Sequence, residues 1–171
     1  MNHKIKEDGK KSMYFNRLRL KCLNSAGVAS LLYRKLFALY SFVLGYDIKY
    51  YTQIGDNFEI FHGARGTVIN PNTVIGNNVT VRQNTTIGAK GFLDSEKCPC
   101  IEDNVTIGPN VCIIGDITIG HDSIIGAGAV VIKDVPAYSV VAGNPAKVIK
   151  KLNPKTGGGK ISIKAFSRFA A

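Results

Sequence analysis

The sequence is short of the features that mark several common classes of protein. It has four cysteines, Cys22, Cys98, Cys100 and Cys112, and they do not form the regular framework of a small disulfide-rich secreted domain. No charged region, apolar core and small-residue cleavage site of a secretory signal peptide opens the chain. We therefore expect a cytoplasmic protein, with contact to the inner face of the membrane as an open alternative.

Candidate metal ligands and candidate bases are few. Cys98-Pro99-Cys100 brings two thiols close together, but no second Cys/His pair at zinc-finger spacing accompanies it. We expect no metal. The chain has only three histidines, His3, His62 and His121, so the choice of a general base is narrow.

The net charge of +10 is concentrated at the two ends of the chain. Residues 1–49 hold ten Lys/Arg and three Asp/Glu, and residues 135–171 hold seven Lys/Arg and no Asp/Glu. The middle of the chain, residues 50–134, holds five Lys/Arg and nine Asp/Glu. Basic ends of this kind suit nucleic acid, an anionic membrane surface, a phosphorylated small molecule or simple solvation. We expect no nucleic-acid partner.

A period of six residues organises the middle of the chain. From Ile101 to Pro136 the sequence divides into IEDNVT, IGPNVC, IIGDIT, IGHDSI, IGAGAV and VIKDVP, and every block opens on Ile or Val. Neither a helix nor an ordinary strand has this period. It predicts a solenoid in which short strands stack coil on coil, the opening residues fill a narrow core, and three blocks make one coil.

The register of the blocks breaks at two places. The openings are Ile48, Ile54, Ile60, Ile69, Ile75, Val81, Ile87 and Ile101, followed by the regular run as far as Val131. Three surplus residues fall in His62 to Thr67, and eight fall in Ala89 to Pro99. Insertions in a repeat protein emerge as loops, where binding and chemistry concentrate. These two loops are the candidate site.

Outside the repeat we expect a basic N-terminal part and a basic C-terminal part. Residues 1–11 are Lys-rich and predict a loose tail, whereas apolar residues at helical spacing predict a helix from Ser25 to Leu44, stopped by Gly45. We expect this helix to pack on the solenoid or on a neighbouring subunit, or to lie on a membrane surface. Arg34 and Lys35 interrupt its apolar run, and the run that follows is too short to span a bilayer. The expected divisions are residues 1–46, 47–143 and 144–171, the last including a linker at Gly157 to Gly159 and a basic tail without an assigned role.

The repeats, followed by Gly126-Ala127-Gly128, Asp134-Val135-Pro136 and Gly143-Asn144-Pro145-Ala146-Lys147, resemble those of the hexapeptide-repeat acyltransferases over residues 45–150. Gly45-Tyr46-Asp47-Ile48 and Ile60-Phe61-His62-Gly63 resemble the serine acetyltransferase-like branch, which includes short exopolysaccharide enzymes such as the colanic acid acetyltransferase. The resemblance implies an all-β, left-handed parallel β-helix with an N-terminal helical segment. It also implies a homotrimer with acetyl-CoA between neighbouring subunits.

His62 is the candidate general base, because it is the one histidine at the mouth of an insertion. Acetyl transfer to an alcohol requires removal of the hydroxyl proton, and imidazole, with an unperturbed pKa near 6.5, suits that task. Asp47 lies fifteen residues earlier, close to one rung below, so its carboxylate can orient the imidazole. The family assigns these two roles at matching positions.

Other site residues follow from the resemblance. The predicted donor site contains Ala89, Pro109 and Ala127, where small residues admit the pantetheine arm, and Lys147, which can meet CoA phosphates or remain solvated. The predicted acceptor site contains Phe61, Arg65, Lys97 and Cys98.

The acceptor residues depart from the serine enzymes, which carry an Asp before the catalytic His and an Arg-His pair in the second loop. Here these places hold Phe61 and Lys97-Cys98. We therefore expect acetylation of a sugar hydroxyl in a capsular polysaccharide, an exopolysaccharide or a precursor. L-serine acetylation and a non-catalytic scaffold remain the alternatives.

Overall fold

The six-residue period folds as short parallel strands separated by turns. The computed structural model describes residues 2–91 and 97–154. In this part the repeat forms β1 (Asp47–Ile48), β2 (Gln53–Ile54), β3 (Glu59–Ile60), β4 (Val68–Ile69), β5 (Val74–Ile75), β6 (Thr80–Val81), β7 (Thr86–Gly88), β8 (Cys100–Ile101), β9 (Thr106–Ile107), β10 (Cys112–Ile114), β11 (Thr118–Ile119), β12 (Ile124–Ile125) and β13 (Val130–Val131). Each predicted opening from Ile48 to Val131 is a buried residue of one of these strands. The predicted register is confirmed.

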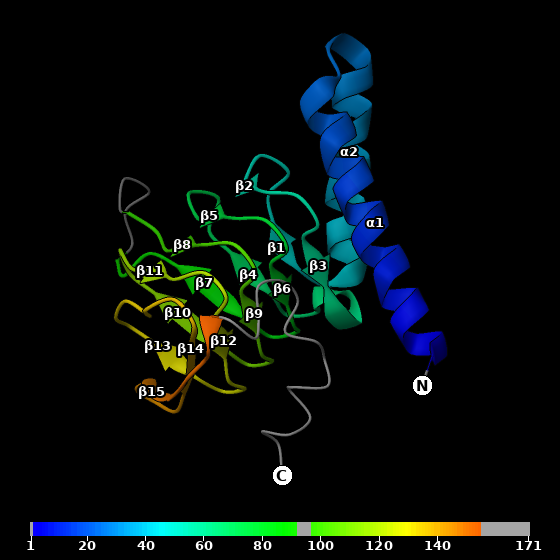
Figure 1. Cartoon of the computed structure of the whole chain (residues 1–171). Helices are drawn as coiled ribbons and strands as arrows, with labels where there is room; N and C mark the ends of the chain where they lie inside the picture. Colours follow the sequence, from blue (N-terminus) through cyan, green and yellow to red (C-terminus); the bar gives the residue numbers. More distant parts are fainter. Residues whose placement is uncertain (1, 92–96, 155–171) are drawn as a thin grey trace.

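Three strands make one coil, so the strands stack into three sheets. Their orders are β1-β4-β7-β10-β13, β2-β5-β8-β11 and β3-β6-β9-β12-β14, where β14 is Ser139–Ala142, and these strands all pair in parallel. Ile48 pairs with Ile69 and Ile69 pairs with Ile87, so the first insertion leaves the stacking intact. The predicted β-helix is confirmed (Figure 1).

The turns stack as well, at three corners of the coil. The His62 corner contains residues 61–67, 82–85, 108–111 and 126–129; the loop corner contains residues 49–52, 70–73, 89–91, 97–99, 115–117 and 132–134; the ladder corner contains residues 55–58, 76–79, 102–105, 120–123 and 136–138. Many of these turns need one residue with positive φ. Asn supplies it at Asn78, Asn84 and Asn104, because its short polar side chain tolerates the left-handed conformation.

Two helices precede the β-helix. Helix α2 (Gly27–Leu44) matches the predicted helix and ends at Gly45, whose φ of 72° is left-handed and whose N–H bonds the carbonyls of Ser41 and Phe42. The prediction of a loose tail over residues 1–11 is wrong, because α1 (Asn2–Asn24) begins at Asn2. The two helices form an antiparallel hairpin (Figure 1).

The helical hairpin closes the first coil. Ser12 Oγ donates to Ile60 O at 3.2 Å and accepts from Ile60 N at 2.9 Å, while Arg19 Nη2 donates to Thr52 O at 2.7 Å. The Phe15 ring lies 5.6 Å from the Phe37 ring, between centroids, and is also close to the rings of Tyr46 and Phe58. Polar groups of the first strands and the open end of the core are therefore covered, which blocks pairing with another sheet edge.

The other end of the β-helix is closed by a reversal of the chain. After β14 (Ser139–Ala142), strand β15 (Lys147–Lys151) runs back antiparallel to it. The expected linker at Gly157 to Gly159 and the basic tail after it lie outside the described residues, and the expected domain divisions stay a prediction.

Candidate active site

His62 lies in the first insertion, on a turn with unusual backbone geometry. The 3-10 helix η1 (Phe61–Ala64) follows β3, and inside it His62 has φ 54° and ψ 26° while Gly63 has φ 70°. A non-glycine residue in the left-handed region is uncommon and carries strain. The His62 side chain is exposed. The insertion therefore presents an imidazole at the surface of a rigid corner.

Backbone hydrogen bonds hold this turn between the chain below and the turn above. Gly66 N donates to Gly45 O at 2.7 Å, and Asp47 N donates to Thr67 O at 2.8 Å. On the other side, Asn84 N donates to Arg65 O at 2.8 Å. Asp47 thus starts the strand that lies directly under the end of the His62 turn.

The Asp47 carboxylate forms an ion pair with the ammonium group of Lys49, its neighbour along the same face of the chain. Asp47 Oδ1 lies 2.8 Å from Lys49 Nζ, and both side chains are about half exposed. The hydrogen bond that Lys49 donates to the Asp47 carboxylate raises the pKa of the Lys49 ammonium above its ordinary value. The contact between the Asp47 carboxylate and the His62 imidazole stays a prediction.

Two residues of the next turn were missed by the sequence reasoning. Arg82 and Gln83 occupy regular turn slots directly after β6, in the coil above His62. The Arg82 guanidinium lies 5.5 Å from the centroid of the Phe61 ring, a cation–π contact. Gln83 Oε1 is buried, and it has no hydrogen-bond partner among the described residues. The candidate acceptor site therefore combines a part-buried aromatic ring with cationic and amide groups.

Small residues continue the His62 corner along the axis of the β-helix. Asn110 N donates to Gln83 O at 3.1 Å, and Gly128 N donates to Pro109 O at 2.9 Å, so Pro109 and Ala127 lie in successive turns above His62. A Cβ added at Gly108 would lie 2.8 Å from Ala127 N, so only glycine fits there. We call this line of turns the small-residue column. Ala127 is exposed and Pro109 is half-buried, so the column presents small side chains at the surface.

Lys147 lies at the upper end of the same corner. The chain passes through the turn 143–146, where Ala146 N donates to Val130 O at 2.8 Å, before β15 begins at Lys147. The Lys147 side chain is exposed. Three of the four predicted donor residues, Pro109, Ala127 and Lys147, are therefore brought onto one corner with His62. They fit a thioester ligand with a narrow arm and anionic phosphates.

Ala89, Lys97 and Cys98 lie at a different corner. Ala89 follows β7, and Lys97 and Cys98 precede β8, so all three belong to the loop corner. Lys97 Nζ lies 3.3 Å from Asp116 Oδ2, and both side chains are largely exposed. The sheet that contains β1 separates this corner from His62. A single chain therefore does not bring the two predicted halves of the acceptor site together.

The cysteines of the second loop are present as thiols. Burial, with a smaller contribution from Glu102, raises the pKa of the Cys100 thiol above its ordinary value. Within residues 2–91 and 97–154, no three His, Cys, Asp or Glu side chains gather into a possible metal site.

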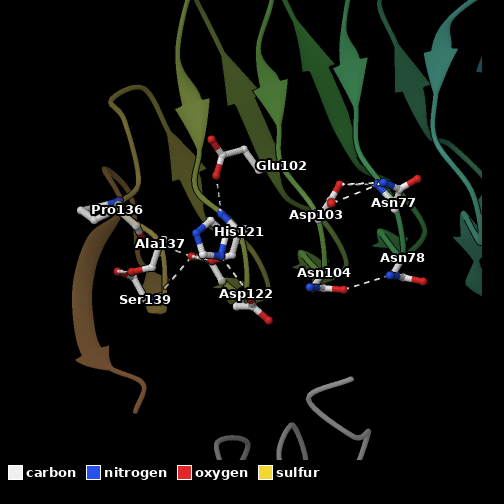
Figure 2. A network of polar contacts seen from close by, with 11 residues as sticks. Asn77, Asn78, Glu102, Asp103, Asn104, His121, Asp122, Pro136, Ala137 and Ser139 are labelled. Carbon is white, nitrogen blue, oxygen red and sulfur yellow. Dashed lines mark hydrogen bonds and ion pairs between the residues drawn. The ribbon is translucent and has the colours of Figure 1, made fainter. Parts of the chain in front are cut away.

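His121 lies at the ladder corner, away from His62. Its Nδ1 lies 2.9 Å from Asp122 Oδ2, and its backbone N–H donates to Glu102 Oε2 at 2.8 Å (Figure 2). The same corner carries a ladder of amides and carboxylates, including Asn78 Nδ2 to Asn104 Oδ1 at 3.0 Å (Figure 2). His121 therefore occupies a regular turn of the repeat, where its imidazole contacts the Asp122 carboxylate.

Comparison with known proteins places this architecture in a family. A family model described as bacterial transferase hexapeptide (six repeats) matches residues 101–133. Serine acetyltransferase 2 of Arabidopsis thaliana is 42% identical over 122 residues, which are 68% of this chain and 38% of that protein. A protein of Escherichia coli K12 named for acetyl transfer in colanic acid biosynthesis, WcaB, is 43% identical over 104 residues, which are 61% of this chain and 63% of that protein.

Solved structures agree with these relatives. Serine acetyltransferase of Neisseria gonorrhoeae superimposes with a TM-score of 0.69 and 31% identity, covering 84% of this chain and 55% of that chain. The soybean serine acetyltransferase complexed with serine gives 0.67 and 32%, covering 79% and 54%. The chain spans less than two thirds of the length of each of these proteins. The chain thus carries the hexapeptide repeat of the bacterial transferases on a left-handed β-helix, and its homologues are the serine acetyltransferases and WcaB.

Proposed function

We propose that this protein transfers acetyl from acetyl-CoA to a hydroxyl group of a sugar in a capsular polysaccharide, an exopolysaccharide or a precursor of one. The observation that carries the proposal is the position of His62 at the foot of the small-residue column. One corner thus offers an exposed imidazole at one end and a line of small side chains beside it. Acetyltransferase relatives of both kinds support the chemistry.

In the proposed reaction His62 accepts the hydroxyl proton while the acceptor oxygen attacks the thioester carbonyl carbon. The C–O bond forms, the C–S bond breaks, and the proton passes to the departing thiolate. Asp47, from the strand below, would fix the tautomer of the imidazole and stabilise the imidazolium. Pro109, Ala127 and Lys147 would bind the CoA moiety, which supplies the activated acetyl group.

The acceptor side favours a saccharide. A zwitterionic amino acid needs buried partners for its carboxylate and ammonium, since desolvating them unpaired costs several kcal/mol. At this corner the residue before His62 is the aromatic Phe61, which offers no charge to such a ligand. Arg82 covers part of the Phe61 ring, which holds the aromatic surface in place for a pyranose. The similarity to a serine complex supports L-serine as the second candidate.

We also propose that the active unit is a homotrimer with its site between subunits. His62 and Lys97 lie at different corners of one β-helix, so a complete acceptor site needs His62 from one copy and the loop corner of another. A closed cyclic trimer forms three such sites. Mixing the inactive variants His62→Ala and Lys97→Ala after dissociation should then restore about a quarter of the wild-type sites, because one in four random neighbours pairs two intact halves. No recovery, or an active monomer in light scattering, contradicts the shared site.

The function is tested by thiol release from acetyl-CoA with L-serine, free sugars, nucleotide sugars and lipid-linked oligosaccharides as acceptors. We expect turnover with a saccharide. His62→Ala should abolish most of it. His121→Asn should not, because it places at the ladder corner the residue type that Asn77 supplies two coils earlier. A kcat/KM of about 10⁴ M⁻¹s⁻¹ or more with L-serine and no saccharide turnover would overturn the sugar assignment. Absence of both CoA binding and turnover would identify a non-catalytic scaffold.

A further inference from the structure

The outward face of α2 is apolar and uncovered. Val28 and Phe42 are 86% and 84% exposed, and the other large apolar residues of this face are also exposed: Leu31, Leu32, Leu36, Leu39 and Val43. They recur at helical spacing along the whole of Gly27–Leu44. A contiguous face of this size marks a surface that binds something, since soluble monomers rarely expose one.

The inward face of α2 is committed to the hairpin and the first coil. Phe37 is buried against Phe15, and the rings of Tyr40 and Tyr46 lie 6.4 Å apart. By length and composition α2 is apolar enough to cross a membrane. Crossing would strip these aromatic contacts from the end of the core, so the packed hairpin suits a helix lying in an interface rather than one spanning it.

The charges around this face are all of one sign. Between Gly9 and Tyr46 the chain has seven Lys/Arg and no acid. Lys35 is exposed in the middle of the apolar face, one turn from Leu31 and from Leu39. Arg34 and Lys21 lie over the rings of Tyr50 and Tyr33, and Arg17 is exposed on α1. Between Gly9 and Tyr46 the hairpin is thus amphipathic, with charges of positive sign alone.

This charge pattern disfavours a second copy of the same face as the occupant. A symmetric contact would bring two Lys35 ammonium groups into an apolar interface, and the hairpin from Gly9 to Tyr46 has no acid to pair with them. Anionic phospholipid supplies the missing countercharge together with an apolar layer for Leu39 and Phe42.

We propose that the outward face of α2, with Lys35 at its centre, binds the surface of an anionic phospholipid bilayer. The hairpin lies across the first coil (Figure 1), and the turn of His62 is next to α1, where a Cβ added at Gly63 would lie 3.7 Å from Lys11 Cδ. Docking of this face therefore holds His62 close to the headgroups, within reach of an acceptor presented at the membrane.

The first test uses the absence of tryptophan from the sequence. Phe42→Trp in the full chain places a fluorescent reporter on the face, and Ile149→Trp, at an exposed site on β15, is the matched control. We expect a blue shift at position 42 with vesicles of phosphatidylcholine containing about 30% phosphatidylserine, and its reversal at high salt. The control should not shift. No shift at position 42, or equal shifts at both positions, overturns the proposal.

The second test measures the partition constant of the unlabelled protein by vesicle co-sedimentation. Lys35→Gln should weaken binding about fivefold, and Leu39→Ser or Phe42→Ser about tenfold. Lys133→Gln and Ile149→Ser should leave binding unchanged, and circular dichroism should show that all five variants are folded.

Equal binding to pure phosphatidylcholine overturns the proposal. Light scattering without lipid gives a further outcome. If Phe42→Ser lowers the mass of the protein but leaves its vesicle binding unchanged, the face binds a second copy and the proposal is overturned. Resistance to alkaline extraction from native membranes would indicate a spanning helix and also overturns it.

Discussion

Replacing His62 by alanine and by glycine separates the catalytic contribution of the imidazole from the effect of the backbone conformation on stability. Both variants lose the base, so kcat should fall by about 10² to 10⁴-fold in both. CoA affinity should hardly change, because Pro109, Ala127 and Lys147 lie in other turns. The two variants should differ only in stability, because His62 has φ 54°.

The stability difference follows from that angle. Alanine in the left-handed region destabilises the folded state by roughly 1–2 kcal/mol, whereas glycine adopts this region at almost no cost. Glycine instead lowers the free energy of unfolding by about 0.4–1 kcal/mol, because it increases the conformational entropy of the unfolded chain. The free energy of unfolding of His62→Gly should therefore exceed that of His62→Ala by roughly 0.5–1 kcal/mol, or about 1–4 °C in Tm.

Thiol release and thermal melts of the two variants measure both effects. His121→Asn serves as the control for loss of an imidazole elsewhere. Wild-type turnover in either His62 variant would refute the assignment of the base. Equal Tm values would refute the strain assigned to the turn.

Three further predictions concern the partner, the column and the second loop. Asp47→Asn should lower kcat less than His62→Ala does in the same assay, since the imidazole is kept, and an equal loss would mean that Asp47 has more than an orienting role. Ala127→Trp should raise the KM for acetyl-CoA about tenfold or more by filling the small-residue column, while Pro136→Trp at the ladder corner should not; unchanged KM in both would remove the column from the donor site. Burial raises the pKa of Cys100 above its ordinary value of 9.0, so the unfolded thiol loses its proton first and the free energy of unfolding should fall as the pH rises past 9. Urea titrations at pH 8 and 10 should show a smaller fall in Cys100→Val, and an identical fall would assign the effect to other groups.

The β-helix could be predicted from the sequence because its period is strict. Each opening Ile or Val must point inward, and a slip of one residue would expose all of them, so Ile48 to Val131 defined both the strands and the three-block coil. Helix α1 could not be predicted in the same way. Its buried face includes Ser12 and Arg19, which are polar and are satisfied by carbonyls of the first coil. Contacts of that kind override the pattern of a Lys-rich segment.

The candidate site was predictable where it departed from the period and was missed where it did not. His62 was found because the insertion after Ile60 shifted the register. Arg82 and Gln83 occupy ordinary turn slots, so only the stacking of their turn on η1 connects them with His62. The separation of Lys97 from His62 arises because one insertion follows the third block of a coil and the other follows the first.

Ile60 stacks under Val81 and Ile69 under Ile87, on either side of the first insertion, and this has a consequence for engineering. The turn from β3 to β4 holds seven residues, whereas the turn from β6 to β7 directly above it holds four, and both join strands in the same register. The scaffold thus tolerates turns of different length at this corner without shifting the coils on either side. We therefore expect that residues 61–67 can be exchanged as a cassette for the turn of another such protein, without moving the turns that contain Pro109 and Ala127.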